Sequence, residues 1–230
     1  MELVSDLFLI RIILALSMLT VGGIYDLWKR EVHDYLWIIF GVSGGILLIF
    51  EPLQMEVIYS TLFALIITPI SIIIWRMGLF GGADAFALIV LAVIAPQLTI
   101  SENSVTPFTT LSNAAILFVI PLLINAFRNL VSTIKGDSIF DGFEEPMLKK
   151  IIISFLGHRA KNPKHGFLIE KTENGVKRIS LSFHHAENEE FTKSKDVWIT
   201  PGISYLLLIL GGFLIQLVFG DLILTFFRIF

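Results

Sequence analysis

The chain contains 230 residues, 55% of them hydrophobic and 16% charged, with a mean hydropathy of +0.80 and a net charge of −3. This composition indicates a membrane protein rather than a soluble domain, and the negative charge argues against a general nucleic-acid-binding protein, which concentrates positive charge to displace counterions from phosphates. Cysteine is absent, which excludes a disulfide framework, a thiolate metal site and a cysteine nucleophile.

Apolar segments, taken in chain order, predict five membrane-spanning helices. A crossing helix needs about 20 mostly apolar residues. The first segment leads from Gly22-Gly23 into Tyr25-Asp26 rather than into a small-residue cleavage site, so we interpret it as a retained helix and not as a signal peptide. The five segments are residues 7–24, 35–50, 57–75, 107–127 and 203–219.

A sixth apolar segment, residues 84–95, is too short for a full crossing in lipid. We expect it to be a short span that neighbouring helices bury. Small residues in the other segments, namely Gly41 and Gly45 and the pair Gly211-Gly212, would permit close helix contacts, and ordinary packing is their favoured interpretation.

The charges of the connecting loops predict an orientation. By the positive-inside rule, loops rich in Lys and Arg face the cytoplasm. Such loops alternate with loops that carry Glu51, Glu56 and Glu102, so both termini are expected outside, an arrangement that six spans fit and five do not. Arg11, inside the first span, is then expected to extend toward the outer interface. The loops assigned to the cytoplasm carry Lys29, Arg30, Arg76, Arg128 and Lys135.

Residues 137–198 are charged and interrupted by Gly and Pro, which predicts a small soluble insert on the cytoplasmic side. Two segments of this insert flank Asn174-Gly175, a dipeptide that favours a tight hairpin because both positions tolerate positive φ. In the second segment, Ile179, Leu181 and Phe183 would share one face of a strand. Residues 146–156 could form a helix on the membrane surface, a packed strand or a buried helix, and the sequence leaves these alternatives open.

The expected fold class is therefore an all-α polytopic membrane protein of about six transmembrane helices, with a small cytoplasmic β-containing insert before the last helix. The expected domains are a transmembrane catalytic bundle at residues 1–136, the insert at residues 137–198, and the last helix with a C-terminal tail at residues 199–230.

Two aspartates are the candidate functional residues, because burying a charge near the bilayer is costly without a purpose. Asp26 follows the first span on the cytoplasmic side, and Asp84 opens the fourth span from the same side. They are thus expected at one membrane depth. Each could instead have an ordinary structural role, since Asp26 could pair with Arg30 at i,i+4 spacing and Asp84 could be a helix N-cap.

A pair of neighbouring carboxylates has a definite chemical use. Repulsion leaves one proton shared between them, so one group activates water while the other protonates the carbonyl oxygen of a peptide bond. Gly81, Gly82 and Ala83 precede Asp84, and the paired glycines would let an extended substrate strand approach the backbone there. A small transporter or channel that binds an ion or proton at the same carboxylates is the alternative, and a non-catalytic membrane anchor is a third hypothesis.

Neither a cofactor nor a metal ion is expected. The histidines in or near the insert show no repeated metal-ligand spacing. They are His158, His165, His184 and His185.

These residues resemble the archaeal preflagellin peptidases, relatives of the type IV prepilin peptidases among the membrane aspartyl proteases. That family has an Asp at the end of the first span before a basic amphipathic stretch, to which residues 26–37 are similar. Its second motif is Gly-x-Gly-Asp, loosely Gly-x-hydrophobic-Asp, and residues 81–84 resemble the looser form with Ala83 in place of the usual glycine. The end of the insert, residues 189–201, is also similar.

The resemblance implies an aspartic endopeptidase that removes a short basic leader at the cytoplasmic face of the membrane. Its substrates would be archaellin-like or pilin-like precursors with class III signal peptides. Asp26 and Asp84 would be catalytic, and Gly81, Gly82 and Ala83 would bind the substrate. Membrane lipid is the other expected partner, and no nucleic acid is expected to bind.

Overall fold

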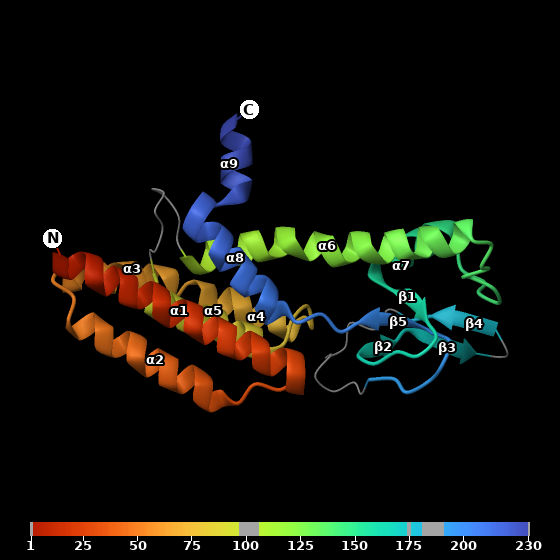
Figure 1. Ribbon diagram of the computed structural model, residues 1–230, viewed down its shortest axis with the longest axis horizontal. Helices are drawn as coiled ribbons and strands as arrows, with labels where there is room; N and C mark the ends of the chain where they lie inside the picture. The colour runs from red at the N-terminus through yellow and green to blue at the C-terminus, as the bar shows by residue number, and fades with distance from the viewer. Residues whose placement is uncertain (1, 97–105, 174–175, 181–190, 230) are drawn as a thin grey trace. The chain divides into compact units, whose positions relative to one another are not determined.

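The computed structural model describes residues 2–96, 106–173, 176–180 and 191–229 (Figure 1). Within it the chain forms two compact units, Met1–Leu117 with Ser204–Phe230, and Phe118–Ile203. The first unit is helical, and the second combines the end of a long helix with a short helix and two small sheets.

Helices occupy all six apolar segments that the sequence analysis identified. Three helical segments are long and apolar enough to cross a membrane: Leu7–Lys29, Gln54–Arg76 and Thr106–Ile134. Three shorter apolar helices complete the set, and the number of six spans stays a prediction. The helices of the first unit are α1 (Glu2–Lys29), α2 (Asp34–Ile49), α3 (Gln54–Ala64), α4 (Ile67–Arg76), α5 (Gly82–Ile94), the first half of α6 (Thr106–Ile134), α8 (Tyr205–Phe219) and α9 (Leu222–Ile229).

The short helix α5 is the centre of the first unit. It contacts α1, α2, α3, α4 and α8, and nine of its 13 residues are buried. Backbone groups of a helix this short can lie at membrane depth because protein rather than lipid surrounds them. The expectation that neighbouring helices bury the short apolar segment is confirmed.

Glycines bring α2 against α5. A side chain at Gly44 would lie 3.2 Å from the Ile94 Cα and 3.0 Å from its Cγ1, so the two backbones approach closely there. Gly41 faces Val90 at ordinary contact distance. The sequence-based choice of Gly45 was wrong, since nothing lies within 4 Å of the position of its missing side chain. The contacting pair is spaced by three residues, not four.

Arg11 clamps α1 to the end of α5. Its Nε bonds Glu51 Oε1 at 2.7 Å, and its Nη1 donates to the carbonyl oxygens of Ile94 at 2.5 Å and Val93 at 3.4 Å. Because a helix carries partial negative charge at its C-terminus, the guanidinium is favourably placed there. The side chain is only 4% exposed, so Arg11 is paired inside the protein, and its expected extension toward the outer interface stays a prediction.

A buried polar network joins the start of α6 to α8. Thr110 donates to Gln216 Oε1 at 2.6 Å, and Gln216 Nε2 bonds Thr106 at 3.1 Å. The expected close contact at Gly212 is confirmed, because a side chain there would lie 2.5 Å from the Thr110 carbonyl oxygen. Polar side chains that satisfy one another in this way hold membrane helices together.

The second unit is built around Trp198. This side chain is fully buried, stacks on Phe140 with ring centroids 4.7 Å apart, and donates from Nε1 to the Ile139 carbonyl oxygen at 2.8 Å. Its strands form a three-stranded antiparallel sheet of order β1-β5-β2 and a two-stranded sheet β3-β4. The elements are α7 (Met147–Leu156), β1 (His158–Ala160), β2 (Gly166–Leu168), β3 (Glu170–Glu173), β4 (Val176–Ile179) and β5 (Val197–Pro201).

The predicted hairpin forms between β3 and β4, with Glu173 opposite Val176 across a two-residue connection. Residues 166–168, which precede β3, pair with β5 and do not extend the hairpin. Of the open alternatives for residues 146–156, the structure has a helix, α7. The residues Asn174, Gly175, Leu181, Phe183, His184, His185, Glu189 and Glu190 lie outside the described residues.

The two neighbouring glycines of α2 provide a test of its packing. We expect Gly44→Leu to destabilise the protein by about 1–3 kcal/mol, the usual cost of overpacking, because the new side chain must push α2 away from Ile94. Gly45→Leu, a matched change in the same helix, meets open space and leaves stability nearly unchanged. Thermal unfolding of both purified variants in detergent measures this, and equal effects at the two positions would contradict the α2–α5 contact.

Candidate active site

Asp26 lies in the last turn of α1, which ends at Lys29. The chain leaves the helix through Arg30, a non-glycine residue at φ 56°, whose N–H donates to the Asp26 carbonyl oxygen at 3.1 Å. The Asp26 carboxylate is partly exposed and forms no ion pair with Arg30 in the described part of the chain. The alternative of an i,i+4 salt bridge is therefore not what the structure contains.

Asp84 occupies the third position of α5, behind an N-cap at Gly81. Its Oδ2 accepts a hydrogen bond from the Gly81 N–H at 2.9 Å, and the residue is 7% exposed. Asp84 is therefore not the N-cap. Its carboxylate nevertheless has a capping role, because it accepts a hydrogen bond from a backbone amide at the start of the helix. This bond fixes the orientation of a buried carboxylate.

The helices α1 and α5 run in opposite directions, which brings both aspartates to one end of the first unit. Arg11 bonds the last residue of α5, whereas Gly22, further along α1, lies beside Trp37 near the start of α2. From Arg11 to Asp26 the helix rises about 22 Å, and from Ile94 back to Asp84 about 15 Å, at about 1.5 Å per residue. Both carboxylates therefore lie beyond the middle of the bundle on the same side.

The start of α8 packs against this end of the bundle. A side chain at Gly23 would lie 2.8 Å from Leu207 Cδ2, so the penultimate turn of α1 touches α8 directly. Tyr205 stacks on Phe80 with ring centroids 5.4 Å apart, and the Asp84 carboxylate acts electrostatically on its phenol. Tyr205 was not among the residues predicted from the sequence. The signal that could have found it was its position as the first residue of the last apolar helix, following Gly202 and Ser204.

The three residues before Asp84 are the N-cap and the first two residues of α5. Gly81 is extended, with φ −80° and ψ 166°, Gly82 is buried and Ala83 is partly buried. The conformational freedom of glycine is used earlier, at Gly78, whose φ of 73° turns the chain out of α4 toward this segment. Gly81 and Gly82 are thus small residues at the start of a buried helix.

Asp34 belongs to the same end of the bundle, because α2 runs alongside α5 in the same direction, with Gly41 near Val90 and Gly44 near Ile94. Its side chain is exposed in the first turn of α2. Among these three aspartates, Asp84 is buried, Asp26 is intermediate and Asp34 is exposed to solvent or lipid.

Comparison with known sequences finds two matching families and several relatives. The type IV leader peptidase family matches residues 13–127, and the Archaeal Peptidase A24 C-terminus Type II family matches residues 149–222. A preflagellin peptidase of Methanocaldococcus jannaschii is 26% identical over 221 residues, which cover 91% of this chain and 93% of the relative. Preflagellin peptidases of Methanococcus maripaludis and Methanococcus voltae are each 25% identical over 90% of this chain and 94% of the relative.

The first of these family matches spans half of the chain and contains both aspartates, the glycines that precede Asp84 and the basic stretch after Asp26. The second covers most of the insert and the last long helix, α8. The relatives align over nearly their whole length, so the agreement extends beyond a motif. This multi-pass membrane protein belongs to the type IV leader peptidase family.

Proposed function

We propose that this protein is an aspartic endopeptidase that removes the short basic leader from archaellin-like or pilin-like precursors at the cytoplasmic face of the membrane. The observation that carries the proposal is the position of Asp26 and Asp84 at the same end of the antiparallel helices α1 and α5. Membership of the type IV leader peptidase family supports it independently.

The proposed chemistry uses the two carboxylates as a pair. One carboxylate takes a proton from water, which attacks the carbonyl carbon of the scissile peptide bond, while the protonated partner donates to the carbonyl oxygen. Collapse of the tetrahedral intermediate breaks the C–N bond, and the leaving nitrogen takes a proton from the pair. The hydrogen bond from Gly81 N–H holds Asp84 in one orientation during these steps.

The proposed substrate fits the surroundings of the pair. A precursor whose apolar helix follows a basic leader would insert that helix beside the protein's own spans and present the polar junction to the carboxylates. Gly81, Gly82 and Ala83 would take up the extended segment around the cleaved bond. The relatives that match along the whole chain are preflagellin peptidases, which supports archaellin-like precursors as the substrate class.

Removal of either charge tests the pair. We expect Asp26→Asn and Asp84→Asn each to reduce leader cleavage at least about a thousandfold, because neither carboxamide exchanges the required proton. Asn at position 84 still offers an oxygen to the Gly81 N–H, so the start of α5 is retained. Cleavage of a co-expressed archaellin precursor, followed by the shift in its electrophoretic mobility, measures the effect.

Asp34→Asn is the matched control, because it removes an exposed carboxylate from the same end of the bundle. It should keep at least half of the cleavage rate. Substantial activity in either the Asp26 or the Asp84 variant would refute the pair. Proton or solute flux in reconstituted vesicles, without leader cleavage, would instead favour the transporter alternative.

The contact between α1 and α8 provides a second test. We expect Gly23→Leu to lower kcat at least about tenfold while the protein stays in the membrane, because the added side chain displaces Leu207 and shifts the turn that carries Asp26. Thr20→Leu, an exposed change one turn earlier in the same helix, should leave kcat unchanged. Steady-state cleavage in detergent measures both variants, and an unchanged kcat in the Gly23 variant would show that this contact does not position the site.

The absence of cysteine allows a direct test of the proposed orientation. Ser138→Cys introduces a thiol in an exposed loop assigned to the cytoplasm, and Gln54→Cys introduces one at the exposed start of α3, assigned to the outside. A membrane-impermeant maleimide added to intact cells should label the Gln54→Cys variant and spare the Ser138→Cys variant, and lysis should allow labelling of both. The reverse pattern would place the aspartates on the outer face.

A further inference from the structure

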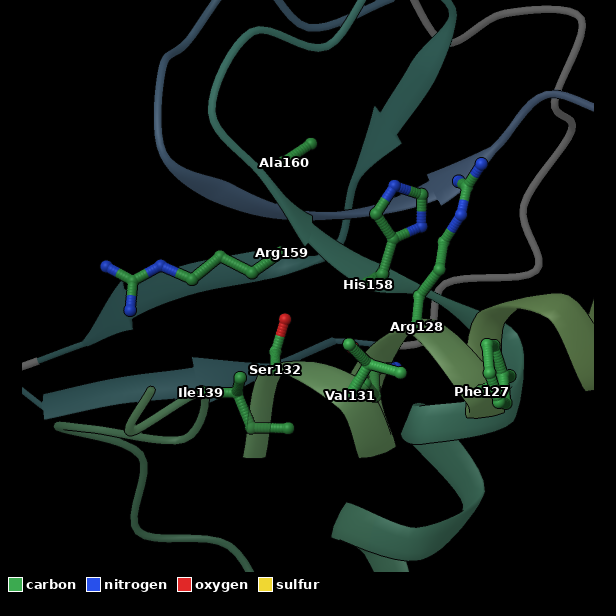
Figure 2. A pocket seen from close by; sticks show the side chains of 9 residues that line it. Phe127, Arg128, Val131, Ser132, Ile139, His158, Arg159 and Ala160 are labelled. Carbon is green, nitrogen blue, oxygen red and sulfur yellow. The ribbon is translucent and has the colours of Figure 1, made fainter. Parts of the chain in front are cut away.

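One face of α6 carries two adjoining cavities within the second unit. The first, of about 500 Å³, is apolar and lies along residues spaced by three and four positions. The second, of about 450 Å³, is lined by both polar and apolar side chains, among them Arg128 and His158, and lies between α6 and β1 (Figure 2). They share Phe127 and Arg128, so an apolar groove continues into a basic pocket. The groove is lined by Ile120, Leu123, Ile124, Phe127 and Arg128.

The basic pocket contains a cation without a counterion. Arg128 forms no ion pair or side-chain hydrogen bond with any residue that the structure describes, and its guanidinium lies beside the His158 ring (Figure 2). Arg159 also lines the pocket, but it points the other way and pairs with Asp196 at 2.8 Å. The uncompensated charge in the pocket is therefore that of Arg128.

His158 is held with one ring nitrogen available. Asn125 Nδ2 donates to the Phe155 carbonyl oxygen at 3.2 Å, so Asn125 Oδ1 must accept from His158 Nδ1–H at 3.1 Å. This leaves Nε2 without a partner in the described part of the chain, and on protonation it becomes a donor. Burial and the neighbouring Arg128 lower the pKa of His158, and a bound anion would oppose the second effect.

We propose that this face of α6 binds one anionic membrane lipid, with its phosphate against Arg128 and His158 and a hydrocarbon chain along the groove. Guanidinium and imidazolium groups bind phosphate through charge-assisted hydrogen bonds. The adjoining apolar side chains are 47–66% exposed, as expected of a surface that faces hydrocarbon. A soluble anion would account for the pocket but not for the groove.

The depth of the site agrees with a lipid. From Ile120 to Arg128 the helix rises about 12 Å, so the groove extends from the headgroup level toward the bilayer centre. Arg128 lies near the end of the apolar span Thr106–Ile134, where lipid phosphates and basic side chains meet. Basic pockets beside transmembrane helices are known sites for anionic headgroups. The inference does not depend on the proposed carboxylate pair.

Equilibrium binding to the purified full chain in neutral detergent tests the proposal. The probes are dioleoylphosphatidylglycerol, dioleoylphosphatidylcholine and inorganic phosphate, with bound lipid counted by native mass spectrometry. We expect the anionic lipid to bind at least tenfold more tightly than either other probe. Arg128→Gln should weaken its binding at least tenfold, and Leu123→Trp, which fills the groove without removing charge, should weaken it as well.

Arg76→Gln is the matched control, because Arg76 is an exposed basic residue at the end of another apolar segment and lines neither cavity. It should change the affinity less than twofold. Equal losses of lipid affinity in the Arg76 and Arg128 variants would show that general surface charge attracts the lipid, and would contradict a specific site at Arg128. Inorganic phosphate that binds as tightly as the lipid would overturn the lipid assignment, and unaltered binding in the Arg128 variant would overturn the whole inference.

Discussion

The buried guanidinium of Arg11 sets the relation between the two helices that carry the aspartates. A charged side chain inside a membrane helix is costly unless it is paired, and here it bonds Glu51 and the last carbonyl groups of α5. Since these carbonyl groups lie at the end of α5, Arg11 lies near the start of α1 and the two helices contact each other, they run in opposite directions. The last turn of α1 and the first turn of α5 then share the opposite end of the bundle.

A short helix can carry Asp84 because protein surrounds it. Gly44 lets α2 pack closely against Ile94 of α5, and Gly23 lets α1 pack closely against Leu207 of α8. The first turn of α5 is buried as well, and there the acidic side chain of Asp84 is oriented by a backbone amide.

Hydropathy and turn residues predicted many of the helices and the hairpin, but they could not predict the contacts between elements. The helices follow from hydropathy, and the β3-β4 hairpin follows from Asn174-Gly175. The positions of Asp26 and Asp84 at helix ends follow from the order of the apolar segments. Gly44 and Gly45 are neighbours in sequence, and only the rotation of α2 decides which one touches α5. Likewise, no sequence pattern predicted the bond from Arg11 to Glu51, because these residues lie 40 positions apart. Tyr205 carried no motif, and its stacking on Phe80 is a product of packing.

The unequal environments of the two carboxylates bear on how they would act as a pair. Asp84 is buried and held by an amide, whereas Asp26 is partly exposed at the end of its helix. Water around Asp26 screens the repulsion between the two carboxylates, because the interaction between charges weakens as the dielectric constant rises. That repulsion is what causes the pair to share one proton. Under the proposed function, an apolar substrate helix that docks beside α1 would displace this water and strengthen the coupling. Cleavage would then depend on the substrate's helix as well as on its leader, since the helix helps to create the environment in which the carboxylates react.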